Sequence, residues 1–435
     1  MSREPRMAIM SIKEQVHSMK MVAPTMAACS IDVRNGALAK MAEMLEQNSE
    51  KIFEANAKDM AAAEENGIAE STKKRLKFNE GKLSDCIEGL KQLQKLPDPI
   101  GAVQIDRMLD DGLELKRVSC PIGVIGVIFE ARPDALIQIS SLCIKSGNCA
   151  ILKGGKETAN TNRVLFEIIY KAAIEAGLPE HCLLQAEQHS EIDELLSCDE
   201  DVDLLIPRGS NKFVRYIMEN TKIPVMGHSS GICHVYVDKA ADQELAVPVV
   251  VDSKIQYAAA CNACETLLVA RPIAREFLPK VAKALRDSGV KIRGTQEVAD
   301  IVDCEVMPDE EFSTEYGNLT ISMKVVEDVV EAVDHINKYG SHHTDSIITE
   351  DDEAASYFME MVDSAGVYRN CSTRFADGFR YGFGAEVGIS TGKIHARGPV
   401  GLEGLTTYKY ELVGTGNIVG DYASGKRSFH FKDLI

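Results

Sequence analysis

A cysteine in the second half of the chain lies in a segment that suits nucleophilic chemistry. Cys261 stands among small residues in the run Ala258-Ala259-Ala260-Cys261-Asn262-Ala263, and the β-rich run Thr266-Leu267-Leu268-Val269 follows it. A loop of small side chains lets a substrate approach the thiol closely, and a buried strand behind the loop would hold it in place. Sulfur can hold an activated carboxyl group as a thioester, which is easy to reduce. The alternative is a buried structural cysteine, the commoner role of this residue type.

Two glycine-containing turns could bind the phosphates of a nucleotide. The first is Lys153-Gly154-Gly155-Lys156-Glu157, and the second is Arg208-Gly209-Ser210; each lies between an apolar run and a helical pattern. Glycine lets a phosphate or ribose lie close to the backbone. A helix that starts after Gly209 would offer its free amides to a pyrophosphate, with Arg208 adding positive charge. Either segment could also be an ordinary turn.

Basic residues in loops could bind an anionic substrate. Arg132 follows the apolar run Ile122–Phe129, where a strand would end, and a guanidinium can grip phosphate or carboxylate in two places. It could equally be a surface residue at a helix start. Further candidates are the basic residues Arg374, Lys393 and Arg397 in the stretch 371–397, whose glycines and length are typical of a functional loop.

Two histidines, His228 and His234, lie near a predicted turn that contains Gly231. They could help to bind anions, although histidines at a turn are more often structural. Neither their spacing nor their neighbours are typical of metal ligands, so no metal site is expected.

Composition restricts the class of protein. The chain has 435 residues, enough for two or three domains, and its 48 Lys and Arg against 66 Asp and Glu give a net charge of −18. This charge argues against nucleic acid or an anionic membrane as the main partner. The 12 cysteines show no disulfide framework or paired zinc spacing, and we find no targeting segment or run of about 20 apolar residues. We therefore expect a reduced, cytoplasmic protein.

The pattern of elements predicts an α/β protein. Helical periodicity covers residues 7–96, an Asp111-Gly112 turn indicates a hairpin, and the apolar run Ile122–Phe129 is typical of a parallel strand buried on both faces. Strand and helix signals then alternate, as in a doubly wound sheet. Strands of that sheet are expected near 149–152, 183–185, 204–206, 225–226 and 233–237, and a second βα series over 272–368.

Several of these motifs together resemble one family. Cys-Asn-Ala-x-Glu-Thr-Leu-Leu-Val from Cys261, the Gly-Gly turn, Ile-Pro-Arg-Gly at 206–209 and the run 388–399 resemble the γ-glutamyl phosphate reductases, the acyl-phosphate-reducing branch of the aldehyde dehydrogenase superfamily. The resemblance spans about 13–434 and implies a Rossmann-type cofactor domain, an α/β catalytic domain and a β oligomerisation arm. The cofactor domain is expected to consist of 1–105 and 121–250 with part of 371–400. The catalytic domain is expected at 251–370, and the arm at 106–120 and 401–435.

The resemblance also implies an activity. It is the NADPH-dependent reduction of L-glutamyl 5-phosphate to L-glutamate 5-semialdehyde, the second step of proline biosynthesis. Cys261 would be the nucleophile, and amides around Cys261 and Asn262 would stabilise the oxyanion. The implied cofactor residues are Lys153, Gly154, Gly155, Lys156, Glu157, Arg208, Gly209, Ser210 and Glu315, and the implied substrate residues are Arg132, Arg374, Lys393 and Arg397.

One departure from the wider superfamily is informative. Aldehyde-oxidising relatives have a Glu in the segment corresponding to 225–234 that activates a hydrolytic water, and this chain has none there. A thioester on Cys261 would then survive long enough to accept hydride. Lys153 and Lys156 favour NADPH over NADH, whereas the nearby Glu157 argues against that preference.

Two other functions are compatible with the motifs. One is an NAD(P)-dependent dehydrogenase that oxidises a free aldehyde, and the other is an inactive paralogue that serves as a binding subunit. For the reductase we expect a stand-alone enzyme, a homodimer or larger homo-oligomer assembled through the hairpin and the tail, with glutamate 5-kinase as a candidate partner.

Overall fold

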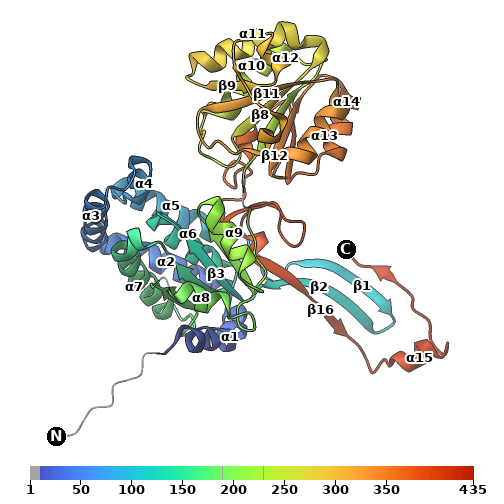
Figure 1. The fold of residues 1–435 in the computed structure, drawn as a ribbon. Coiled ribbons are helices and arrows are strands. Elements are labelled where there is room, and N and C mark those ends of the chain that lie inside the picture. Colours follow the sequence, from blue (N-terminus) through green and yellow to red (C-terminus); the bar gives the residue numbers. More distant parts are fainter. Residues whose placement is uncertain (1–9, 189, 229) are drawn as a thin grey trace. The chain divides into compact units, whose positions relative to one another are not determined.

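The computed structural model describes residues 10–188, 190–228 and 230–435, and it divides into two compact units (Figure 1). The first unit runs to Met226 and also contains Phe383–Gly388 and Val400–Ile435. The second unit consists of Gly227–Gly382 and Ile389–Pro399. In the described ranges no helix is both long and apolar enough to cross a membrane.

Helices form the N-terminal part of the first unit, as the periodicity predicts. The first helix is stabilised by a capping box, in which Ser11 Oγ accepts the Glu14 amide and Glu14 Oε2 accepts the Ser11 amide. Leu38, Met41 and Leu45 share one buried face of the second helix. The helices are α1 (Ile12–Ala28), α2 (Ile31–Gln47), α3 (Ser49–Glu65), α4 (Glu70–Leu76) and α5 (Glu80–Lys95).

A parallel sheet with the strand order β5-β4-β3-β6 is the centre of the first unit. Every residue of β3 (Val124–Phe129) is buried, which explains its continuous apolar sequence. The other strands are β4 (Cys149–Lys153), β5 (Leu183–Ala186) and β6 (Leu204–Arg208), and the helices are α6 (Pro133–Lys145), η1 (Lys156–Thr158), α7 (Ala159–Glu175), α8 (Ser190–Leu196) and α9 (Asn211–Glu219). The strand expected at 225–226 is only a one-residue bridge, between Val225 and Leu205.

The predicted hairpin is present and belongs to an antiparallel sheet with the order β16-β2-β1-β17. Gly112 makes its turn with φ +70°, and a Cβ added there would lie 2.7 Å from Thr415 Oγ1. The hairpin strands are β1 (Val103–Asp110) and β2 (Leu113–Pro121), and the tail contributes η4 (Glu403–Leu405), β16 (Thr406–Val413), α15 (Val419–Ala423) and β17 (Lys432–Asp433). We call these strands the arm.

A longer parallel sheet, in the order β10-β9-β11-β8-β7-β12-β13, is the centre of the second unit. Its strands are β7 (Cys233–Val237), β8 (Cys264–Ala270), β9 (Lys291–Gly294), β10 (Glu305–Val306), β11 (Thr320–Val326), β12 (Thr344–Ile348) and β13 (Gly366–Arg369). The helices are α10 (Gln243–Ile255), α11 (Arg271–Asp287), α12 (Gln296–Ala299), η2 (Asp309–Ser313), α13 (Val329–Tyr339) and α14 (Asp352–Met361).

This sheet differs from the sequence-based expectation in two ways. The strand expected at 233–237 was assigned to the first sheet, but β7 pairs with β8 and β12, so residues 227–250 belong to the second unit. A buried apolar run fits either sheet, and only the tertiary fold selects its partners. The sequence analysis also missed β11, which lies between β8 and β9.

The stretch 371–400 contains only short elements, in agreement with its glycine-rich sequence. These are η3 (Thr373–Phe375), β14 (Gly388–Ser390) and β15 (Gly398–Val400). Residues 371–382 and 389–399 belong to the second unit, and 383–388 to the first.

Candidate active site

Cys261 lies in a short loop between the end of α10 and the start of β8. Two turns shape this loop, because the Ala260 amide donates to the Tyr257 carbonyl at 3.1 Å and the Ala263 amide donates to the Ala260 carbonyl at 2.9 Å. All residues of β8 are buried, so the strand anchors the loop. Cys261 itself is half-buried. The second unit therefore places the Cys261 thiol on a loop before a buried strand, as the sequence predicts.

A glycine packs directly against this cysteine. A Cβ added at Gly231 would lie 2.2 Å from the Cys261 carbonyl oxygen and 2.5 Å from its Cα, which is closer than real contacts allow. Gly231 precedes β7, the neighbour of β8 in the sheet. Only glycine lets these two loops approach so closely, and the position of the nucleophile depends on it.

His343 is the nearest titratable neighbour of the thiol. Its Nε2 lies 3.2 Å from Cys261 Sγ, and its Nδ1 lies 2.9 Å from Thr344 Oγ1. The ring is fully buried just before β12. Because β8, β7 and β12 are parallel neighbours, the loops before them open at the same edge of the sheet and bring together residues that are 82 positions apart. A cysteine beside a histidine is the arrangement that delivers a thiolate at neutral pH.

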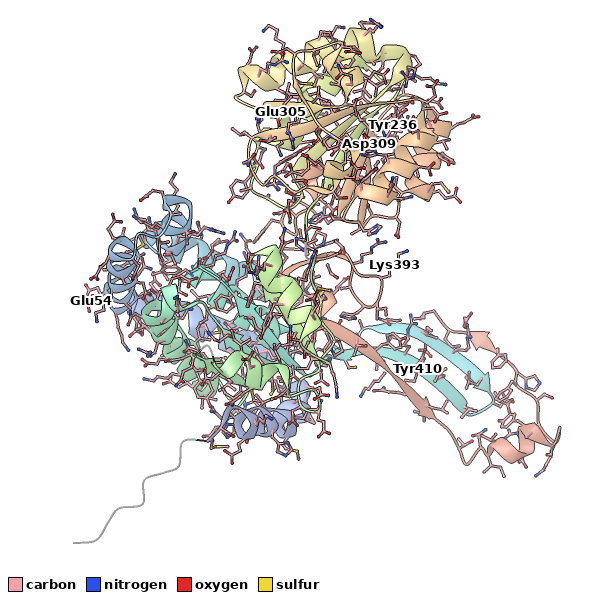
Figure 2. All side chains as sticks on the ribbon, in the orientation of Figure 1. Glu54, Tyr236, Glu305, Asp309, Lys393 and Tyr410 are labelled. Carbon is pink, nitrogen blue, oxygen red and sulfur yellow. The ribbon has the colours of Figure 1, made fainter. Side chains whose placement is uncertain are left out.

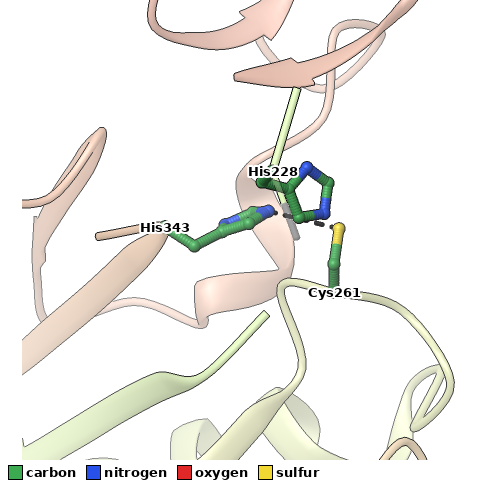
Figure 3. Close-up of side chains that lie close together, drawn as sticks. All are labelled: His228, Cys261 and His343. Carbon is green, nitrogen blue, oxygen red and sulfur yellow. Dashed lines mark hydrogen bonds between the residues drawn. The ribbon is translucent and has the colours of Figure 1, made fainter. Parts of the chain in front are cut away.

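His228 completes a cluster of three side chains (Figure 3). Its Nδ1 lies 2.9 Å from the Ile389 carbonyl oxygen, and since a carbonyl only accepts, Nδ1 carries a proton. The rings of His228 and His343 meet edge to face with centroids 5.1 Å apart. By contrast, His234 is fully buried and bonds to Asp345 Oδ1 at 2.9 Å, in agreement with the structural alternative for that residue.

Burial separates Cys261 from the adjacent cysteines. Burial raises the pKa of Cys264 to about 12 and that of Cys233 well above its usual range. Such thiols stay protonated at neutral pH and are poor nucleophiles. The geometry therefore favours Cys261 over its neighbours in the same loop system.

Asn262 and Arg374 also lie in this region of the second unit. The Asn262 amide nitrogen donates to the Ala376 carbonyl at 2.8 Å, so this side chain ties the nucleophile loop to the stretch after η3. Arg374 Nε donates to Gln256 Oε1 at 2.9 Å. Burial lowers the pKa of Arg374, and the nearby Cys261 sulfur opposes that change. A guanidinium that interacts electrostatically with the thiol would favour an anionic substrate there.

Lys393 and Arg397 both converge on one carboxylate. Lys393 Nζ lies 2.8 Å from Asp363 Oδ2, and Arg397 Nη2 lies 3.0 Å from Asp363 Oδ1. The hydrogen bond from Lys393, together with Arg397, lowers the pKa of Asp363. Lys393, labelled in Figure 2, is 67% exposed. The two predicted substrate residues therefore form ion pairs with Asp363 in this structure, and these pairs compete with an anionic ligand.

Glu315 lies in the loop before β11, and this loop is tied to the strand that follows Cys261. The Gly317 amide donates to Glu265 Oε1 at 3.2 Å, and Glu265 Oε2 lies 2.7 Å from Lys254 Nζ. Both members of this ion pair are buried, and burial raises the pKa of Glu265 to about 7 against the opposing effect of Lys254. The nucleophile and the Glu315 loop therefore share one support.

In the first unit, the glycine turn after β4 is compact. The Glu157 carboxylate accepts the Ala131 amide at 2.7 Å, and a Cβ on Gly155 would lie 2.2 Å from that carboxylate. Lys153 is buried, and its Nζ donates to the Gly154 carbonyl at 2.7 Å. Burial lowers the pKa of Lys153. The exposed Lys156 begins η1.

The second turn, before α9, differs from its expected state. Glu130 Oε2 accepts the Ser210 amide at 3.0 Å, and a Cβ on Gly209 would lie 2.6 Å from the same oxygen. The Ser210 amide that was expected to face a pyrophosphate is therefore used by a carboxylate. Arg208 is the last residue of β6, and the exposed Arg132 precedes α6.

Comparison with known proteins identifies the family. The chain matches the model of the Aldehyde dehydrogenase family over residues 3–299. It is 53% identical to the γ-glutamyl phosphate reductase of Ruminiclostridium cellulolyticum over 420 residues, which is 97% of either chain. The chain belongs to the γ-glutamyl phosphate reductase family. Family and fold class were both predicted from the sequence, and both are confirmed.

Other members of the γ-glutamyl phosphate reductase family agree with this assignment. The reductase of Acetivibrio thermocellus is 52% identical over 420 residues, again 97% of either chain. The crystal structure of the reductase of Thermotoga maritima superimposes with a TM-score of 0.92 at 38% identity and covers 94% of this chain and 100% of that one.

The sequence analysis of this reductase family member missed His343 altogether. The signal that could have found it is the run Ser341-His342-His343-Thr344 directly before a strand. The predicted site residues in the first half of the chain lie at strand ends, because parallel sheets usually carry their sites there. The candidate nucleophile instead lies where β7, β8 and β12 begin.

Proposed function

We propose that this chain reduces L-glutamyl 5-phosphate to L-glutamate 5-semialdehyde, with NADPH as the hydride donor and release of phosphate, as the second step of proline biosynthesis. The observation that carries the proposal is the contact of 3.2 Å between Cys261 Sγ and His343 Nε2. The segment 225–234, where aldehyde-oxidising relatives have a glutamate, contains none. A nucleophilic thiol without a hydrolytic carboxylate suits reduction of an acyl phosphate.

The acylation step follows from the cluster around Cys261. His343 Nε2 takes the thiol proton as sulfur bonds to the substrate carbonyl carbon. Amides around Cys261 and Asn262 stabilise the oxyanion, and the carbon–oxygen bond to phosphate then breaks. Phosphate leaves and takes its proton from solvent, while Arg374 balances negative charge near the sulfur. The acyl group is then a thioester on Cys261.

The reduction step returns the thiol to its starting state. When bound, NADPH supplies the hydride that converts the thioester to a tetrahedral thiohemiacetal. The oxyanion of this adduct re-forms a carbonyl as the carbon–sulfur bond breaks. The sulfur takes the proton back from His343, and the aldehyde leaves. Because the segment 225–234 contains no glutamate, it lacks the base that would activate water to hydrolyse the thioester in between.

The glycine turn of the first unit fits the phosphates of NADPH. Lys153 lies within ion-pair distance of no carboxylate among the described residues, so its ammonium can pair with a phosphate. Lys156 is exposed beside it. Ser210 does not contribute to this fit, because Glu130 already accepts its amide. We assign NADPH binding chiefly to the turn 153–157.

The arm supports the proposal of a homodimer or larger oligomer. Tyr408, Tyr410 and Leu412 alternate along β16 and are 49%, 57% and 56% exposed. Lys409 and Glu411 occupy the opposite face of the strand. An apolar stripe on an edge strand is normally covered by a partner.

A single assay tests the proposed reaction. Purified protein is supplied with glutamate 5-semialdehyde and NADP+, with and without inorganic phosphate, and formation of NADPH is followed. We expect turnover that requires phosphate and is lost in Cys261→Ser. Phosphate-independent turnover would identify an aldehyde-oxidising dehydrogenase, and nucleotide binding without turnover would identify an inactive paralogue.

A further inference from the structure

Three metal-binding side chains meet at Cys261 although they come from three separate loops. Suitable ligand atoms of His228, Cys261 and His343 all lie within 4.8 Å of one another. Each residue precedes a different strand of the second unit, namely β7, β8 and β12, and Figure 3 shows their side chains pointing toward one another. We infer that this cluster binds a thiophilic divalent cation of the zinc type, and that the cation blocks the nucleophile.

The spacing is close to that of a tetrahedral zinc site. With Zn–S and Zn–N bonds of the usual length, a sulfur and a nitrogen ligand lie about 3.6 Å apart. Cys261 Sγ and His343 Nε2 are 3.2 Å apart, so this pair needs almost no movement to accept the ion. The widest pair must close by about 1 Å, a small adjustment for a half-buried histidine.

Both histidines are oriented by hydrogen bonds from their other nitrogen. His228 Nδ1–H donates to the Ile389 carbonyl, which leaves Nε2 with its lone pair. His343 Nδ1 bonds to Thr344 Oγ1, and its Nε2 already faces the sulfur. In metal sites, a hydrogen bond from the ring nitrogen that does not bind the metal holds the imidazole in the correct tautomer and orientation. The cluster therefore presents preoriented ligands.

The ligand types select the ion. One thiolate and two imidazoles suit Zn²⁺ and similar soft or borderline ions, whereas Mg²⁺ and Ca²⁺ prefer oxygen ligands. Three protein ligands leave a fourth position for water or a substrate oxygen. When the ion binds, the Cys261 S–H bond breaks, the proton leaves to solvent and a sulfur–metal bond forms. The metal then withdraws electron density from the sulfur and occupies the space beside it, so the sulfur attacks a carbonyl far more slowly.

Blocking of the reaction rests on the proposed function, whereas metal binding does not. An enzyme already acylated on Cys261 has no free sulfur for the ion. Zn²⁺ should therefore compete with the acyl phosphate, and substrate should protect the enzyme from the metal.

Cobalt provides the direct test of binding. The full chain is treated with a chelator, freed of it and titrated with Co²⁺, whose thiolate charge-transfer absorption reports a bond to sulfur. We expect about one equivalent with that absorption, displaced by Zn²⁺. Cys261→Ser should remove the absorption, and His228→Ala and His343→Ala should each weaken Zn²⁺ binding by more than about tenfold.

Two matched variants control for unspecific binding. Cys304→Ser removes another half-buried thiol of the second unit, and His342→Asn removes the histidine next to His343. Asn suits the positive φ of 59° at that position. Both variants should bind Co²⁺ and Zn²⁺ as the parent chain does.

A second readout measures the thiol without turnover. Iodoacetamide labelling of Cys261, followed by mass spectrometry, should slow at least tenfold in Zn²⁺ and should not slow in His228→Ala at the same Zn²⁺ concentration. Cobalt binding without thiolate absorption, or zinc affinity unchanged in both histidine variants, would overturn the site. Thiol protection in a chain that lacks phosphate-dependent turnover would keep the site and overturn the reductase proposal instead.

Discussion

At the scale of single residues, the chemistry depends on what surrounds one sulfur atom. Cys261 has an imidazole nitrogen at 3.2 Å, whereas burial raises the pKa of Cys264, three residues later, to about 12. Cys261 lies in the loop and Cys264 begins β8, so the two thiols are close in the chain but differ in their surroundings. Reactivity follows the thiolate, so the neighbour at 3.2 Å distinguishes them.

We expect His343→Gln to lower kcat by about 10²-fold, because Gln keeps the shape and polarity of the site but cannot take the thiol proton. The rate of iodoacetamide labelling of Cys261 at neutral pH should fall in parallel. His342→Asn is the control. Unchanged kcat and labelling would show that His343 has no part in activating the thiol.

Gly231→Ala should lower kcat by about 10²-fold, since a misplacement of about 1 Å at the reacting group has that effect. The added Cβ would lie 2.5 Å from Cys261 Cα, so the nucleophile loop must move. NADPH affinity should not change, because the glycine turn belongs to the other unit.

Gly89→Ala in α5 is the matched control for Gly231→Ala, as a Cβ there meets nothing within 4 Å. Steady-state kinetics and a thermal melt separate a displaced thiol from a destabilised fold. Parent-like kcat in Gly231→Ala would contradict the close contact.

At the scale of elements, three loop amides of the two units donate hydrogen bonds to carboxylates that are distant in the sequence. Glu157 reaches back to the Ala131 amide, Glu130 caps the Ser210 amide, and Glu265 holds the Gly317 amide. An amide bound to a carboxylate is satisfied and is not offered to a ligand. The glycine turn after β4, with its two lysines, is therefore the better phosphate site.

Lys153→Met combined with Lys156→Ala should raise the Kd for NADPH by about tenfold or more and change that for NADH much less, because only NADPH carries a 2′-phosphate. Met preserves the buried stem of Lys153, which Ala would replace by a cavity. Fluorescence titration with both nucleotides measures it, with the exposed Lys171→Ala as control. Equal weakening of both nucleotides would refute the assignment to the 2′-phosphate.

His335 on α13 should make the second unit sensitive to acid. Its ring packs against Phe312 and Tyr339, and neither ring nitrogen has a hydrogen-bond partner within the described residues. Burial lowers the pKa of His335 to about 2. Below pH 6.5 the unfolded chain binds a proton that the folded unit does not, so stability falls as pH falls, by at most about 1.4 kcal/mol per pH unit.

His335→Leu should therefore reduce the loss of unfolding free energy between pH 7 and pH 5.5, measured by urea denaturation. His342→Asn, at a partly exposed site, should keep the dependence of the parent. An acid dependence that is the same in parent and His335→Leu would show that another group titrates.

At the scale of the whole molecule, the tail folds back on the hairpin of its own chain. Residues 406–413 of β16 pair with β2, and β17 pairs with β1. The edge of β2 is thus covered along its length by β16, and the edge of β1 is covered by β17 at Arg107 and Met108. On β16 the side chains of Tyr408, Tyr410 and Leu412 form an exposed stripe, where Figure 2 labels Tyr410. An oligomer would be built on that stripe and on the outer edge of β16.

Light scattering should find at least a dimer for the full chain, and Tyr410→Glu combined with Leu412→Glu should give monomers, because charge on the stripe cannot be buried against a partner. Lys409→Ala with Glu411→Ala, on the opposite face, should leave the assembly intact. Deletion of 401–435 should also give monomers, but it exposes β2. A full chain that is monomeric at micromolar concentration would refute the proposal.

Much of this protein is determined by local sequence. The helical N-terminal stretch, the Asp111-Gly112 turn, the buried strand β3 and the nucleophile segment at Cys261 could all be predicted, because each depends on neighbours in the chain. The motifs also pointed to the right family. Spacing within a few residues carries this information, since turn conformation and hydrophobic periodicity are short-range effects.

Only the tertiary structure decided which distant residues meet. β7 is an apolar run that fits either sheet, and its pairing with β8 and β12 placed Gly231 and His343 against Cys261. Strand order cannot be inferred from local periodicity, because every buried parallel strand shows the same pattern. The thiol was visible in the sequence, whereas the imidazoles beside it appeared only once three loops were brought to one edge of a sheet.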